Sequence, residues 1–195
     1  MHLLYRIPVL RKALLLNQNV IFDLIYRRKL KCKVNIFGFP IISIKKGADI
    51  KIGKNLTLIS NSFFSETGVY HPVIIRLLNN NSKLRIDNNV GINGGSICVE
   101  KEVIIEDEVM LGANVLVADT DFHPVEPYNR RYRRDNVKSE KIVIKRNVFI
   151  GMNSIILKGV TIGENTVVGA GSIVTKNLPP NVIAVGNPCK VVREI

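Results

Sequence analysis

Aliphatic residues recur at an interval of six positions through the C-terminal part of the chain. A helix repeats about every 3.6 residues and a strand about every 2, so this interval indicates an internal repeat. A chain that turns a corner at each repeat needs a small residue at the corner and an aliphatic side chain inside it. The pattern therefore predicts an all-β solenoid with triangular coils. The aliphatic series is Ile144, Ile150, Ile156, Ile162, Val168 and Val174, and the glycines that follow three of its members are Gly151, Gly163 and Gly169.

The same interval appears upstream and is then interrupted. Ile105, Leu111 and Val117 follow it, but the series resumes only at Ile144, although the next member would fall at position 123. Inserted residues cannot stay within a coil, so we expect residues 119–141 to project as a loop. Long loops in compact folds commonly carry function. A second irregular, polar stretch covers residues 60–73.

The 195 residues suit one domain with a small cap. We expect an N-terminal helical cap over residues 1–33, because apolar residues there have roughly helical spacing and end in the basic run Arg27–Lys33. This helix either covers the open end of the solenoid or lies on a membrane surface. The solenoid is expected over residues 34–185, and residues 186–195 form a C-terminal tail.

Composition narrows the choice of partners. The net charge of +12 favours an anionic partner, such as a phosphorylated cofactor, a phospholipid surface or an anionic polysaccharide precursor. Aromatic residues make up 6% of the chain and no recognition motif is present, so we expect no nucleic-acid partner. No apolar run reaches the roughly 18 residues of a membrane span. The three cysteines have no metal-ligand spacing, which predicts unpaired thiols in a reducing compartment. We therefore expect a cytoplasmic protein, which either stays in solution or lies at the inner face of the membrane.

Three motifs and the tail carry a family resemblance. Ile150–Ser154, Gly159–Gly163 and Gly169–Lys176 match the hexapeptide signature, and Gly186–Ile195 resembles the end of galactoside and maltose O-acetyltransferases. The upstream half is similar to O-acetyltransferases of polysaccharide biosynthesis. The resemblance implies a left-handed parallel β-helix, a homotrimer, and acetyl-CoA bound between neighbouring subunits, with no metal.

Acetyl transfer to a hydroxyl needs a general base, and His123 is the candidate. It lies at the start of the projecting loop, and an imidazole with a pKa near ~6.5 suits this task. The catalytic histidine of the resembling family occupies the matching place. Asp119, Asp121 and Glu126 are within local reach of its second ring nitrogen, and we favour the two aspartates as orienting groups. His71 either lines the acceptor pocket or is structural.

The remaining site residues come from the resemblance. The amide of Met152 matches an oxyanion donor, Asn93 matches an asparagine near the attacking hydroxyl, and Phe149 stands where the galactoside enzymes have a tryptophan. The residues implied in acetyl-CoA binding are Gly151, Gly169, Ala170, Thr175, Lys176, Lys190 and Arg193.

We therefore expect a CoA-dependent O-acetyltransferase acting on a sugar or glycolipid in surface polysaccharide or glycolipid biosynthesis. Alternatives are an N-acetyltransferase of an amino sugar or nucleotide sugar, and a non-catalytic trimeric scaffold. A zinc carbonic anhydrase would need three histidines, whereas His71 and His123 are the only internal ones. The arginines at positions 130, 131, 133 and 134 either bind an acidic group of the acceptor or form a solvated run. Cys98 and Cys189 are expected to be core or tail residues, not nucleophiles.

Overall fold

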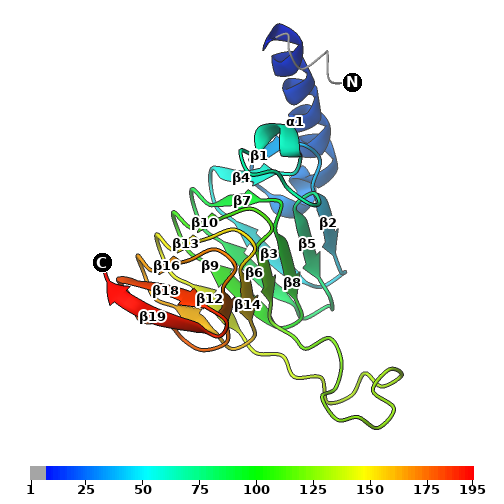
Figure 1. Ribbon diagram of the computed structural model, residues 1–195. Helices are drawn as coiled ribbons and strands as arrows, with labels where there is room; N and C mark the ends of the chain where they lie inside the picture. The colour runs from blue at the N-terminus through cyan, green and yellow to red at the C-terminus, as the bar shows by residue number, and fades with distance from the viewer. Residues whose placement is uncertain (1–7) are drawn as a thin grey trace.

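The computed structural model describes residues 8–195 as one helix standing on a column of triangular coils (Figure 1). Residues 1–7 of the predicted cap, including His2, lie outside the described residues. Each full coil contributes one strand to each of three sheets, so β1 to β14 each pair with the strand three places further along the chain, and β16 pairs with β18 where the last coil is incomplete. The pairing is parallel throughout, except for the final hairpin.

The three sheets have the following strands. Sheet A contains β1 (Val34–Phe37), β4 (Leu56–Ile59), β7 (Gly91–Asn93), β10 (Met110–Leu111), β13 (Phe149–Ile150), β16 (Val167–Val168), β18 (Val182–Gly186) and β19 (Cys189–Glu194). Sheet B contains β2 (Ile41–Ile44), β5 (Ile74–Leu77), β8 (Ser96–Val99), β11 (Leu116–Ala118), β14 (Ile155–Leu157) and β17 (Ile173–Val174). Sheet C contains β3 (Asp49–Ile52), β6 (Lys83–Ile86), β9 (Glu102–Ile105), β12 (Ile142–Ile144) and β15 (Thr161–Ile162).

The hexad series lines the inside of the column. All six members from Ile144 to Val174 are fully buried, and members of successive coils stack in register, as Leu111 does on Ile150 and Ile150 on Val168. The core is therefore a column of aliphatic rungs. The predicted solenoid is confirmed, and the fold is a left-handed parallel β-helix.

Corner glycines allow the coils to stack closely. A Cβ atom on Gly151 would lie 2.4 Å from the amide nitrogen of Ala170 in the next coil. At Gly163 it would lie 2.3 Å from the nitrogen of Pro180. Real Cβ atoms do not approach this closely, so any larger residue would push the coils apart.

Helix α1 (Pro8–Leu30) covers the open end of the column. Phe22 and Leu30 are buried against the first coil. The side-chain amide of Asn19 accepts a hydrogen bond from the Ile36 amide (2.9 Å) and donates one to the Ile36 carbonyl (3.1 Å). These bonds pair both backbone groups of Ile36 on the open edge of β1, and covering such an edge is the task of a solenoid cap. No helix in the described part of the chain has the length and hydropathy needed to cross a bilayer.

Two segments leave the column from different corners. Residues 60–73, between β4 and β5, project where sheet A meets sheet B, which we call the A–B corner. Residues 119–141, between β11 and β12, project where sheet B meets sheet C, the B–C corner. In Figure 1 this second loop extends away from the coils. Sheet B thus has one projecting segment at each of its two edges.

Candidate active site

A groove of about 460 Å³ runs along sheet A beside the A–B corner. Its wall spans β4, β7, β10, β13 and β16, which are neighbours in the sheet, so its length is roughly 19 Å at ~4.8 Å per strand. Five residues predicted for the site line it, namely Asn93, Gly151, Met152, Gly169 and Ala170. Phe149, in the place of the family's tryptophan, also lines it.

The groove presents backbone donors that the fold does not use. Within the described residues, the amides of Met152 and Ala170 make no hydrogen bond, whereas the neighbouring amides of Gly151 and Gly169 bond to the next coil. Phe149 and Val167 give the groove apolar walls. Free amides in an apolar groove suit the carbonyl and amide groups of an extended thioester ligand.

His123 lies at the other corner of sheet B. It is exposed and borders a small cavity of about 320 Å³ with Asp121, Pro124 and Arg130. Its Nδ1 is 3.1 Å from a guanidinium nitrogen of Arg134. The ring is therefore held within its own loop, and it does not line the groove at the A–B corner.

The carboxylate of Asp119, predicted to orient His123, has backbone partners in the structure. The Asp119 carboxylate is buried and accepts three backbone hydrogen bonds, from the amides of Glu100 (2.7 Å), Lys101 (2.8 Å) and Glu102 (2.7 Å). Burial raises the pKa of Asp119, and these three donors act in the opposite direction. Asp119 therefore fastens the loop root to the coil above it.

Asp121 also has a partner other than the imidazole. Its carboxylate oxygen lies 2.6 Å from Nζ of Lys158, and both side chains are about three-quarters buried. Only the backbone links it to the histidine, because its carbonyl accepts from the His123 amide at 2.7 Å. The pair Asp121–Lys158 ties the loop to the coil below, so the aspartates brace the loop from two sides.

The arginine cluster is largely used within the loop. Arg133 forms a bidentate pair with Asp135, at 2.7 Å and 3.0 Å, and Arg130 donates to the Val125 carbonyl. Arg134 donates to backbone carbonyls as well as to His123. These contacts favour the interpretation of the four arginines as a solvated run that orders the loop, over a site for an acidic group of the acceptor.

The predicted nucleotide-binding residues lie in two places. Thr175 and Lys176 are exposed at the B–C corner of the last coil, on the side of His123. Lys190 and Arg193 are exposed on β19, at the end of sheet A. A single chain does not bring all the predicted residues together, because the histidine and the groove lie at opposite edges of sheet B.

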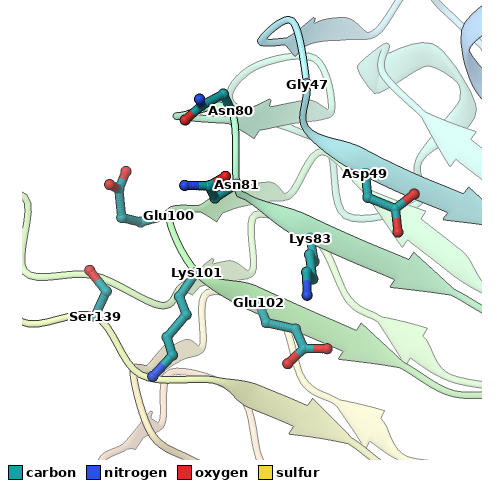
Figure 2. Close-up of a pocket in the computed structure, with 9 residues that line it drawn as sticks. All are labelled: Gly47, Asp49, Asn80, Asn81, Lys83, Glu100, Lys101, Glu102 and Ser139. Atoms are coloured by element: carbon teal, nitrogen blue, oxygen red, sulfur yellow. The ribbon is translucent and has the colours of Figure 1, made fainter.

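A separate cavity of about 620 Å³ lies at the B–C corner above the loop root (Figure 2). Its lining is polar and of mixed charge, with Lys83, Lys101 and Glu102 among the side chains, and none of the predicted site residues borders it. The described residues contain no cluster of three or more His, Cys, Asp or Glu side chains that could hold a metal ion.

Residues that the sequence did not single out also line the groove. Phe64, Ser65, Glu66 and Thr67, from the segment 60–73, form one end of it. Their only signal in the sequence is the irregular, polar character of that segment.

Two family models match the chain. The bacterial transferase hexapeptide model (six repeats) matches residues 141–176, and the model for the hexapeptide repeat of succinyl-transferase matches residues 102–118. The resemblance to hexapeptide-repeat acyltransferases is thereby confirmed.

Several acyltransferases of known structure or activity are similar to this chain. Galactoside O-acetyltransferase of Escherichia coli K12 is 44% identical over 115 residues, which are 58% of this chain and 55% of that protein. A solved galactoside acetyltransferase in complex with coenzyme A is 29% identical with a TM-score of 0.53, covering 89% of this chain and 69% of that one. A mutant of AntD, an N-acyltransferase from Bacillus cereus in complex with dTDP and coenzyme A, is 25% identical with a TM-score of 0.57, covering 80% and 85%. The chain spans about half the length of the curated relatives it matches.

Proposed function

We propose that this protein is an acetyl-CoA-dependent O-acetyltransferase that acts on a sugar hydroxyl. The observation that carries the proposal is the groove at the A–B corner, where the unpaired amides of Met152 and Ala170 line an apolar channel that leads to Asn93. The similarity to galactoside O-acetyltransferases and to a structure in complex with coenzyme A supports the same choice.

In the proposed mechanism the thioester lies in the groove with its carbonyl oxygen toward the Met152 amide. Asn93 aligns the acceptor hydroxyl, and His123 removes its proton as the oxygen attacks the thioester carbon. The Met152 amide stabilises the oxyanion that forms, and the C–S bond then breaks as the protonated His123 returns its proton to the leaving sulfur, which releases the CoA thiol and the acetyl ester. No acyl-enzyme is required, since hydroxyl and thioester meet directly.

The mechanism requires two copies of the chain, and we propose the homotrimer implied by the resemblance. The outer face of sheet B carries a row of residues in register that is almost entirely apolar, comprising Ile41, Ile74, Ser96, Leu116, Ile155 and Ile173. The corresponding row of sheet C begins with Asp49, Lys83 and Glu102. An apolar face of this kind favours burial between subunits. With sheet B facing a threefold axis, the A–B corner of one copy meets the B–C corner of the next, so the groove receives His123 from the neighbour.

Binding of acetyl-CoA tests the enzyme class. Calorimetric titration should give saturable binding at one site per chain, weakened in the double variant Lys176→Ala, Arg193→Ala. Absence of binding at millimolar acetyl-CoA would favour the scaffold alternative.

Mixing two inactive variants tests the shared site. His123→Ala removes the base, and Ala170→Trp fills the groove at an exposed position. Each variant alone should be inactive. In randomly mixed trimers, about a quarter of the sites should combine an intact loop with an intact groove and recover activity. A mixture that stays inactive would show that each chain contains its own complete site.

An N-acetyltransferase is the second candidate, and the similarity to an N-acyltransferase in complex with coenzyme A favours keeping it. Comparing methyl hexosides with the corresponding amino sugars as acceptors decides between them. An enzyme that acetylates only the amine would replace the O-acetyl proposal.

We further propose that the acceptor is a surface polysaccharide or glycolipid precursor, and that the protein works in the cytoplasm at the inner face of the membrane. The support is helix α1, whose outward stripe exposes Leu16 (67%), Val20 (52%) and Leu24 (78%). Exposed Arg28 and Lys29 follow in the same helix, and the chain has a net charge of +12. An apolar stripe flanked by basic residues suits the surface of an anionic membrane.

A further inference from the structure

The segment of residues 60–73 is a compact lobe on the A–B corner. At the next coil the same corner needs only Gly94 and Gly95 to connect β7 with β8. The lobe contains a short 3-10 helix, η2 (Ser62–Phe64), whose first turn is capped by the side chain of Asn61. The fold therefore does not need these residues to turn the corner.

Hydrogen bonds join the two ends of the lobe and, further out, its two strands of backbone. The Val73 amide donates to Oγ of Ser60 at 3.1 Å. Oγ of Ser62 accepts from the Val69 amide at 3.1 Å and donates to the Val69 carbonyl at 2.9 Å. These bonds define the shape of the lobe before any ligand arrives.

The lobe is also fastened to the column. The Tyr70 amide donates to the side-chain oxygen of Asn114 at 2.8 Å, and the ring of Phe64 packs 5.5 Å from that of Phe37. Gly94, with φ +56°, leaves room for Val69, since a Cβ there would lie 2.4 Å from the Val69 side chain. A segment held at so many points can act as a rigid wall.

That wall closes the polar end of the groove. Ser65, Glu66 and Thr67 of the lobe line the same end of the groove as Asn93, whereas the opposite end is formed by Val167 and the corner backbone. The side-chain amide of Asn93 donates to Oγ of Ser65 at 3.0 Å. This bond fixes which way the Asn93 amide points.

Two polar atoms at this end have no partner. Oδ1 of Asn93 is buried and makes no hydrogen bond to any described residue. Oγ of Ser65 accepts from Asn93, and its own proton has no acceptor within the part of the chain that the structure describes. An acceptor without a donor and a donor without an acceptor, side by side, match a hydroxyl group, which can both donate and accept.

We propose that the lobe of residues 60–73 is the acceptor-binding wall of the groove, and that Ser65 is a specificity-determining residue which donates to a hydroxyl of a neutral, hydroxyl-rich ring. Asn93 accepts from a hydroxyl of the same ring. The Glu66 carboxylate at the same end disfavours an anionic group close to the reacting centre, so any phosphate of the acceptor points out of the groove. The proposal rests on the proposed acetyltransferase function.

The test compares two variants that each remove one hydroxyl from the lobe. Ser65→Ala removes the hydroxyl that faces the groove. Tyr70→Phe removes one from a side chain that is 79% exposed and serves as the matched control. Each variant is titrated with acetyl-CoA and then with methyl galactoside, methyl glucoside, methyl mannoside and their monodeoxy analogues in the presence of saturating CoA. Initial rates of acetylation are measured with the same compounds.

We expect Ser65→Ala to raise KM for the preferred hexoside at least tenfold, to leave Kd for acetyl-CoA unchanged, and to abolish discrimination against one monodeoxy analogue. Tyr70→Phe should behave as the wild type. If Ser65→Ala keeps the wild-type KM for the hexoside and still discriminates against the monodeoxy analogues, Ser65 is not a specificity-determining residue. The proposal is also overturned if the wild-type protein binds acetyl-CoA but none of the hexosides. Failure of the wild type to bind acetyl-CoA is a different result, because it removes the acetyltransferase function itself and the subsite with it.

Discussion

The guanidinium of Arg134 lies 3.1 Å from Nδ1 of His123. Because arginine can only donate, Nδ1 must be the acceptor, and the proton of the neutral ring resides on Nε2. The lone pair that could remove a substrate proton is therefore covered by Arg134. Before His123 acts as a base, Arg134 must therefore leave Nδ1, because a proton on Nδ1 would face the guanidinium donor.

We expect Arg134→Ala to keep kcat at the wild-type level or to raise it a few-fold, because it removes the group that covers the base. His123→Ala should lower kcat by roughly 10² to 10⁴-fold while Kd for acetyl-CoA stays unchanged. Steady-state rates and calorimetry check both. A fall of more than tenfold in Arg134→Ala would show instead that Arg134 holds the ring in its working position.

Asp119 should prove to be a stability residue. Asp119→Ala leaves the amides of residues 100–102 without their acceptor, and since these amides are only partly buried, each lost bond costs up to about 1–3 kcal/mol. Thermal unfolding of Asp119→Ala should show a clear fall in Tm. The Tm of Asp119→Asn should lie between those of the wild type and Asp119→Ala, because asparagine keeps one side-chain oxygen as an acceptor. Folded Asp119→Asn should retain near wild-type kcat. A large loss of kcat at unchanged Tm would restore the catalytic role that the sequence suggested.

The glycine corners allow a matched comparison. Gly151→Ala places a methyl group against the backbone of Ala170 and should destabilise the fold by about 1–3 kcal/mol through overpacking. Gly91→Ala is the control, because its Cβ would meet nothing within 4 Å. Denaturant titration of both variants measures the difference in the free energy of unfolding. Equal stability of the two variants would mean that the coils can move apart freely.

The fold was predictable because its signal is local. Ile144, Ile150 and Val168 repeat along the sequence at the interval of the corners, and an interruption of that interval located the projecting loop. The site was only partly predictable. Asp119 looked like a partner for His123, four positions away, yet its carboxylate contacts amides in the coil above. Such contacts between coils, like the position of Ser65 beside Asn93, depend on stacking and have no local pattern.

The thiol of Cys98 should be a poor nucleophile. Burial raises its pKa, Asp119 adds to the shift, and Arg76 opposes it. Since only the thiolate reacts, alkylation by iodoacetamide at pH 8 should be slower than for an unfolded chain and should still be increasing above pH 9. Mass spectrometry of the labelled peptide follows Cys98 separately from Cys32 and Cys189. Cys98→Ala should retain acetyl transfer, and its inactivation would reopen the question of an acyl-enzyme.

Helix α1 should bind anionic vesicles through its exposed stripe. Leu16→Ser with Leu24→Ser removes apolar side chains worth about 1.5–3 kcal/mol each when fully buried, so the bound fraction should fall by roughly tenfold or more. Arg28→Glu with Lys29→Glu tests the charge contribution, which should weaken as salt is added. Cosedimentation with phosphatidylglycerol vesicles measures both, and phosphatidylcholine vesicles are the control. Lys83→Glu, on β6 of sheet C and one coil further from the helix than β3, should change binding little. If the double leucine variant binds vesicles as the wild type does, the apolar stripe does not contact the membrane. A sedimentation coefficient that differs between this variant and the wild type in the absence of lipid would then show that a second copy of the chain covers the stripe.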